Sequence, residues 1–209
     1  AYEKNFTQLV ETLNQADEVE TALHAVTKIN ALRSQLDTMV NVALIRHSVN
    51  TLDEFYTKED EYFNEYLPLF EKLDADYYDA LLKSDFQEAL RAVFPETLFL
   101  IAEGKAKIFS PEIIPLLQKE NELISQYGKL NAEAEIFFEG KNRTLSEMTP
   151  FTKAKDRHTR KLAQEAITHH FVKNESEFDR IYDELVTLRN DIALKLGFKD
   201  YVDYSYVKM

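Results

Sequence analysis

Residues 19–47 read VETALHAVTKINALRSQLDTMVNVALIRH and contain neither glycine nor proline. Apolar residues recur in this stretch at three- and four-residue spacing, which is the pattern of an amphipathic helix. They are Val19, Ala22, Leu23, Val26, Ile29, Leu36, Val40, Ala43 and Leu44. At 1.5 Å per residue such a helix is about 40 Å long. The stretch therefore predicts a protein built on long helices.

A second long helix is expected after a break at residues 47–51. Thr51 and Glu54 have the spacing of a capping box, in which each side chain satisfies a free backbone N–H. The helix that follows carries an apolar stripe rich in Phe and Tyr as far as Tyr77. Pro68 lies inside it and predicts a kink near Tyr66. Two long helices with a short joint predict an antiparallel helical hairpin.

The middle of the chain predicts shorter elements. Residues 80–109 are expected to form short helices, interrupted at Phe94-Pro95 and at Glu103-Gly104. Ser110-Pro111-Glu112 has the composition of a helix start, with serine as the cap and proline at the first helical position. Residues 134–145 depart from the helical period, and they predict a short β-hairpin around Gly140.

The last third predicts helices again after Thr149-Pro150. Asp156 is expected to cap one helix, and Asn174 with Glu177 the next. Gly197 is placed to end that helix in a left-handed conformation, and a short further helix is expected over residues 199–206. The predicted fold class is all-α, mainly long antiparallel helices, with one short β-hairpin near residues 134–145.

Composition excludes several classes of function. The 209 residues carry a formal net charge of −12, which argues against nucleic-acid binding. There is no cysteine, so disulfides and thiolate metal sites are excluded and a reducing, cytoplasmic location is expected. No stretch approaches the roughly 18 uncharged residues of a membrane span, so no membrane association is expected.

No catalytic, cofactor-binding or metal-binding residue can be assigned from the sequence. A His-Glu-x-x-His run, a phosphate loop and a Gly-x-Ser-x-Gly nucleophile context are all missing. The five histidines are His24, His47, His158, His169 and His170. Glu20/His24 and Glu165/His169 are i,i+4 pairs that could meet a metal, but weak surface pairing is the favoured interpretation. Of the adjacent His169 and His170, one is expected to be partly buried and the other solvated.

Aromatic residues are frequent in the second long helix. Phe55, Tyr56, Tyr62, Phe63 and Tyr66 have helical spacing. Ordinary core packing is the favoured interpretation of this row, and a peptide-binding surface is the alternative, since tyrosine suits a half-hydrated groove wall.

The sequence resembles a known family over essentially its whole length. The similarity is carried by short motifs in a fixed order: INALR at 29–33, IRHS at 45–48, DEFY at 53–56, FSPEII at 109–114, IFFEGK at 136–141, KDR at 155–157 with Arg160, Ala163 and Phe171, IYDELVTLR at 181–189, IALKLGFKDYV at 192–202 and YSYVKM at 204–209. Together they resemble the oligoendopeptidase F branch of the M3, thimet oligopeptidase-like, zinc metallopeptidases.

This resemblance implies a cytoplasmic zinc peptidase that cleaves short peptides inside a channel between two helical lobes. Residues 1–109 would be an N-terminal helical hairpin or bundle, and residues 110–176 a helical region of the oligopeptidase F type with the β-hairpin. Residues 177–209 would be the first helices leading into a catalytic domain, whose zinc motif is implied to lie beyond Met209.

By the same resemblance the zinc belongs to the complete protein and is not bound by this segment, which is expected to be inactive alone. Its expected partners are the catalytic lobe of the same polypeptide and short peptide substrates. An isolated lobe is also expected to expose apolar surface. The alternative function is a non-enzymatic helical interaction module.

Overall fold

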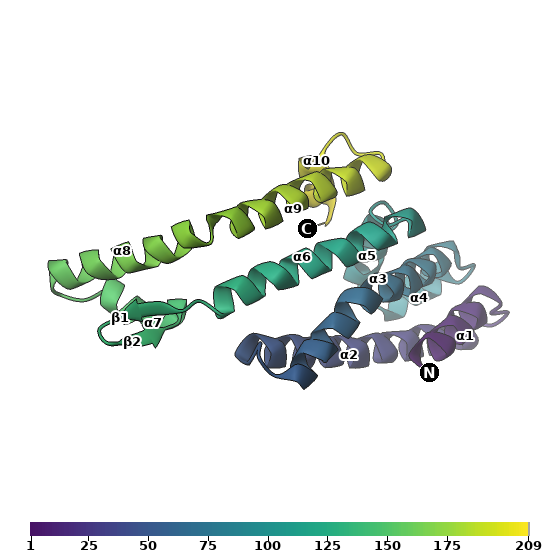
Figure 1. Cartoon of the computed structure of the whole chain (residues 1–209). Coiled ribbons are helices and arrows are strands. Elements are labelled where there is room, and N and C mark those ends of the chain that lie inside the picture. The colour runs from purple at the N-terminus through teal and green to yellow at the C-terminus, as the bar shows by residue number, and fades with distance from the viewer. Residues whose placement is uncertain (209) are drawn as a thin grey trace.

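The computed structural model describes residues 1–208 and confirms the predicted fold class, with helices throughout and one two-stranded hairpin (Figure 1). The elements are α1 (Tyr2–Asn14), α2 (Val19–Val49), α3 (Glu54–Lys83), α4 (Gln87–Val93), α5 (Glu96–Lys105), the 3₁₀ helix η1 (Pro111–Ile113), α6 (Ile114–Ala132), β1 (Ile136–Phe138), β2 (Lys141–Arg143), α7 (Leu145–Thr152), α8 (Arg157–Lys173), α9 (Glu175–Lys195) and α10 (Tyr201–Lys208).

The helices α2 and α3 form the predicted antiparallel hairpin. His47 near the end of α2 pairs with Asp60 near the start of α3, while Arg33 pairs with Asp74 further along. The predicted capping box of Thr51 and Glu54 is wrong. Asp53 caps α3 instead, because its carboxylate directly precedes the first helical residue and accepts from the N–H groups of Phe55 and Tyr56.

The helix α3 continues through Pro68, whose ring is buried in the interior. The predicted interruption at Phe94-Pro95 is confirmed, because α4 ends at Val93 and α5 begins at Glu96. The interruption at Glu103-Gly104 is wrong, since α5 runs to Lys105. A single glycine costs a helix only about 1 kcal/mol relative to alanine, which the packing of α5 on α3 offsets.

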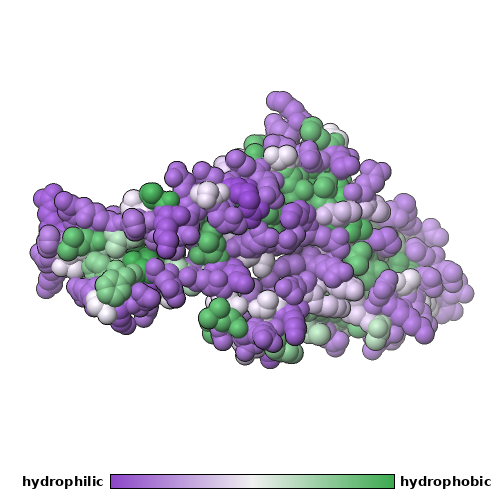
Figure 2. Space-filling view, in the orientation of Figure 1, coloured by the Kyte–Doolittle hydropathy of each residue, from purple (hydrophilic) through white to green (hydrophobic). Residues whose placement is uncertain are grey.

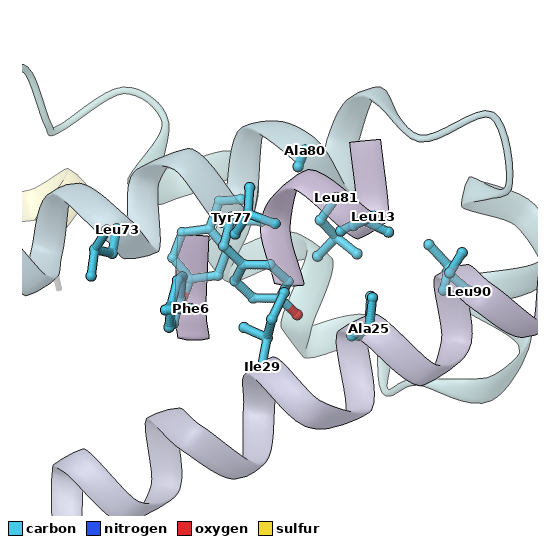
Figure 3. Packing of buried hydrophobic residues seen from close by; sticks show 14 of the residues in the cluster. Phe6, Leu13, Ala25, Ile29, Leu73, Tyr77, Ala80, Leu81 and Leu90 are labelled. Atoms are coloured by element: carbon cyan, nitrogen blue, oxygen red, sulfur yellow. The ribbon is translucent and has the colours of Figure 1, made fainter. Parts of the chain in front are cut away.

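The largest core lies between α1, α2, α3, α4 and α5 (Figure 3). Phe6 of α1 inserts between the hairpin helices and meets the ring of Tyr77 edge to face, with centroids 6.3 Å apart. Ile29 of α2 and Leu81 of α3 are also fully buried. The short helix α1 therefore closes the open side of the α2–α3 hairpin.

The predicted start at Ser110 is confirmed, because its hydroxyl accepts from the N–H of Glu112 and η1 leads directly into α6. The predicted β-hairpin is confirmed as well, with Ile136 opposite Arg143 and Phe138 opposite Lys141. Its two turn residues have positive φ, 47° at Glu139 and 81° at Gly140. Type I′ turns require this conformation at both central residues.

The return to helix was predicted too late, after Pro150. The helix α7 already begins at Leu145, since Thr144 and Glu147 form a capping box with each other. That box uses Thr144 as a cap, so the second strand ends at Arg143. A small separate core joins the hairpin to α7 and α8 through Ile136, Phe138, Met148 and Ala163.

The helices α8 and α9 follow each other in nearly one line above α6 (Figure 1). Asp156 caps α8 as predicted, by accepting from the N–H of Thr159 at 2.7 Å. Asn174 is the N-cap residue of α9, as predicted, but its side chain makes no cap bond to α9, because its amide donates backwards to the carbonyl of His170. Gly197 ends α9 with φ 83°, and the N–H of Phe198 reaches the carbonyl of Ala193 at 3.0 Å, as in a Schellman motif.

A third group of buried residues joins the middle of the chain to its last helices. Ile113 and Leu117 pack with Ile192, Ala193 and Tyr204. Because α6 also packs on α3, it connects the first core to α9 and α10.

Candidate functional site

The candidate metal ligands of the sequence do not lie close together in the structure. His24, His158 and His169 are exposed, and Glu165 lies 3.6 Å from Lys161. His169 is exposed and His170 half-buried, as predicted for this adjacent pair. Among residues 1–208 no three His, Cys, Asp or Glu side chains lie together as ligands of a metal would.

The aromatic row of α3 divides between core and surface. Phe63 is buried, and Tyr56 and Tyr66 are half-buried. Phe55 and Tyr62 keep 60% and 47% of their surface exposed. Tyr62 stacks on Tyr66 with ring centroids 4.4 Å apart. Core packing thus explains Phe63, while Phe55 and Tyr62 offer apolar surface at the outer part of the hairpin.

A buried polar cluster holds the outer parts of α2 and α3 against α6. Asp60 is its centre and is only 5% exposed. The Asp60 carboxylate accepts hydrogen bonds from Ser125 Oγ at 2.5 Å and Asn64 Nδ2 at 2.9 Å, and it lies 3.3 Å from Nδ1 of His47. The other ring nitrogen of His47, Nε2, is buried and has no hydrogen-bond partner among the described residues. Serine here meets the carboxylate rather than the imidazole, so the cluster lacks the order of a nucleophilic triad.

A second polar group lies where α3, α5, α6 and α10 meet. A cavity of about 50 Å³ is lined there by the carboxylates of Glu71 and Asp74 and by the ammonium groups of Lys105 and Lys208. Partial removal from water raises the pKa of both carboxyl groups. Removal from water alone would lower the pKa of Lys208, but Tyr204, Glu120 and Glu71 raise it. The cavity has room for water and not for a peptide. The attraction between Glu71 and Lys208 favours the contact of α10 with α3.

A third polar contact links α6 with α9. Arg189 Nε donates to Glu120 Oε1 at 2.7 Å, and the Glu120 side chain is 8% exposed. The guanidinium of Arg189 also lies 5.5 Å from the ring centroid of Tyr201. Ser125 lies 65 residues from Asp60, and Arg189 lies 69 residues from Glu120. Spacing patterns therefore gave no signal for these two contacts between helices.

Large apolar side chains are exposed at several places on the molecule. In the orientation of Figure 2 apolar areas interrupt the hydrophilic surface, and one of them lies at the narrow left end. The large apolar residues that are more than half exposed are Met39, Ile45, Val49, Leu52, Phe55, Val93, Leu100, Tyr127, Phe137, Val172, Tyr182, Leu194, Val202 and Tyr206. None of the described helices is long and apolar enough to cross a bilayer.

Comparison with known proteins identifies the family. The family model described as Peptidase M3 N-terminal domain matches residues 1–109. A crystal structure of a protein assigned as an oligoendopeptidase F from Bacillus anthracis str. Ames superimposes with a TM-score of 0.96 at 42% identity, covering 99% of this chain and 38% of that one.

Two further solved structures give the same result. PZ peptidase A with an inhibitor has a TM-score of 0.96 at 42% identity, covering 99% of this chain and 37% of that one. A second oligoendopeptidase F structure has a TM-score of 0.96 at 41% identity, with 99% and 37% coverage. No curated protein sequence matches the chain. The chain thus spans less than two fifths of the length of these solved proteins.

Proposed function

Because the chain belongs to the M3 peptidase family, we propose that it is the non-catalytic N-terminal part of a zinc-dependent oligoendopeptidase that hydrolyses short peptides in the cytoplasm. The observation that carries this proposal is the match to an oligoendopeptidase F structure over 99% of the chain at 42% identity. In the complete protein these helices would form part of the wall of a substrate channel, which restricts access of water and of bulky substrates.

A zinc site in this segment would need donor side chains that lie together in space. Zinc in peptidases takes three protein ligands from His, Asp or Glu and keeps one position open. The described residues bring no such set together, so the chain's own residues do not fit a zinc site. We therefore place the metal and the hydrolytic step in the remaining part of the polypeptide.

The exposed apolar side chains support an interface with that part. Leu194, Val202 and Tyr206 lie on the last two helices, and each exposes more than half of its surface. Helices 177–209 would accordingly lead into the catalytic domain and be covered by it. Residues 1–109 would be a first unit, which is supported by a core that draws only on α1 to α5. Residues 110–176 would form the region between them.

The test compares the isolated 209 residues with a complete protein that carries them. Each is supplied with zinc and assayed on quenched fluorescent peptides of graded length and on a folded protein substrate. The complete protein should hydrolyse the short peptides, lose activity with a chelator and spare the folded protein, while the isolated chain should be inactive.

Chelator-sensitive hydrolysis by the isolated chain would contradict the assignment of the metal to the remainder. Failure of the complete protein to cleave any peptide would favour the alternative, a helical interaction module. Shortening the α3 segment 51–79 in the complete protein should change the length preference more than zinc content, since this segment is proposed to shape the channel.

A further inference from the structure

The hairpin of α2 and α3 leaves the first core about half-way along its length. The last residue of α2 in that core is Ile29, and the first residue of α3 packed against it is Phe70. Residues 30–69 form the outer half of the hairpin, which extends beyond α1 (Figure 1). On one side this outer half packs on α6, where Asp60 binds Ser125. The opposite side of α2 remains exposed.

That exposed face of α2 changes from polar to apolar along the helix. Residues at three- and four-residue spacing share one face of a helix. In order along the chain, this face carries His24, Lys28, Ala31, Gln35, Met39, Val42, Ile45 and Val49, all of them exposed. The last four, here called the α2 stripe, keep 61%, 39%, 62% and 79% of their surface exposed. One helix face therefore has a hydrated first half and an apolar second half.

The segment that carries the α2 stripe is almost free of charge. Within residues 38–50, Arg46 is the only Asp, Glu, Lys or Arg, in a chain of which 30% of the residues are charged. Arg46 itself lies 3.4 Å from Glu59 of α3. The inner face of the same segment is apolar too, with Val40 half-buried and Ala43 buried. A helix segment that is apolar on opposite faces is typical of one that is covered on both.

The chemistry of the α2 stripe fits a permanent protein interface. The buried centre of an interface is depleted of charged residues and enriched in methionine, and permanent interfaces are more apolar than transient ones. Sites for small ligands are instead concave and hold a few converging polar groups. The α2 stripe runs along the convex side of a single helix, so a short peptide is a poor occupant.

The remaining part of the polypeptide has the size and the connection that such a partner needs. This chain covers 38% and 37% of the two solved oligoendopeptidase F chains, so more than three fifths of each lies outside the matched segment. A partner tethered to the same chain has a high effective concentration. It can therefore cover a narrow apolar surface without the larger area that a separate molecule requires.

We propose that the α2 stripe is a contact surface for the catalytic part of the same polypeptide, which covers the outer half of the hairpin. This inference rests on the proposed function and adds to it the side of the hairpin that meets the catalytic part. The polar half of the same face, from His24 to Gln35, stays in water. The contact is separate from the one proposed for α9 and α10.

Methionine oxidation tests this contact on the unmodified complete protein. Met39 is 61% exposed in the described segment, while Met148 is fully buried and serves as an internal reference. Peroxide converts accessible methionine to its sulfoxide, which mass spectrometry reads at each site. Met39 should oxidise at least about tenfold more slowly in the native complete protein than in urea, because a covered side chain reacts only through local opening. Oxidation of Met39 at the rate found in urea would overturn the proposal.

Two matched substitutions on the same helix face sharpen the test. Ile45→Asp places a charge inside the proposed contact, so it should raise the oxidation rate of Met39 towards the rate in urea. Ala31→Asp adds the same charge to the hydrated half of the face and should leave that rate slow. Met148 must stay protected in both variants, which shows that each is folded. Equal oxidation of Met39 in the two folded variants would overturn the proposal, and the measurement on the unmodified protein decides alone if a variant does not fold.

Other occupants of the α2 stripe would give different results. A contact between two copies would lose its protection of Met39 as the protein is diluted, and a peptide substrate would protect Met39 only when it is added. Either result would overturn the assignment to the catalytic part. The readout does not need peptidase activity. An active protein with an accessible Met39 therefore contradicts the contact alone, and an inactive protein with a protected Met39 contradicts the proposed function alone.

Discussion

Replacement of Asp60 by alanine should destabilise the protein far more than any exposed acid-to-alanine change on the same helix. The substitution removes the acceptor of Ser125 and Asn64 and the partner of His47. Ser125 and Asn64 are half-buried and can turn to water, whereas His47 is 8% exposed and its Nε2 already lacks a partner. The loss is therefore dominated by the imidazole.

A buried polar group left without a partner costs about 1–3 kcal/mol, and one lost hydrogen bond to a charged group adds about 1.5 kcal/mol. We expect Asp60→Ala to lower the free energy of unfolding by about 3 kcal/mol, which is about 6–12 °C in Tm for a chain of this size. Urea unfolding followed by circular dichroism measures the free energy, and an unchanged m-value shows that the two end states remain comparable.

Matched variants separate this effect from a general loss of charge. Asp60→Asn keeps the volume and one acceptor oxygen, so it should cost clearly less than alanine. Asp76→Ala removes an exposed acid of α3 that lies 3.5 Å from Lys72, and it should cost at most about 0.5 kcal/mol. The reasoning is refuted if Asp60→Ala and Asp76→Ala have the same stability, since burial of the cluster would then contribute nothing.

Three further predictions concern other parts of the molecule. Glu120→Ala should cost about 2–3 kcal/mol in urea unfolding because it leaves Arg189 partly buried and unpaired, and adding Arg189→Met should recover part of that loss. Gly140→Val should lower the free energy of unfolding by about 1–3 kcal/mol, because valine strains a turn position with φ 81°. Gly104→Ala in α5 has open space around it and should raise the free energy of unfolding by up to about 1 kcal/mol. Equal effects of the two substitutions would contradict the turn assignment. The cap bond from the N–H of Thr144 lowers the folded-state pKa of Glu147, so the contribution of Glu147 to stability is lost as the pH falls through that pKa. The folded-state pKa of Glu71 is raised, so its contribution to stability is present in acid and is lost as the pH rises through that pKa. Stability–pH curves of Glu147→Gln and Glu71→Gln, measured against the parent chain, should therefore differ from it with opposite signs.

The helical architecture follows from local signals and was largely predictable. The apolar spacing of residues 19–47 and the absence of glycine and proline define α2, and Gly140 with its positive φ defines the hairpin turn. Caps were less predictable where two candidates stand close together. Asp53 outcompetes Thr51 because it is adjacent to the helix start, and Asn174 bonds backwards to the end of α8 rather than forwards into α9.

The polar groups of the interior were not predictable from spacing. His47 meets Asp60 on the next helix, and Glu120 meets Arg189 from an element 69 residues further on. Such pairs form only where the faces of two particular helices pack on each other. An amphipathic pattern shows which face of a helix is buried, but it does not show which other helix covers that face. Family motifs identified the protein's relatives but assigned no role to these residues.

The self-contained first core bears on how the protein is made. Its residues, including the partly buried ones, all come from positions 2–102, so none of them belongs to α6 or to a later helix. Domains at the N-terminal end fold first during synthesis. This core can therefore assemble on the ribosome before α9 is translated, and it gives each later helix a finished surface on which to dock as it emerges.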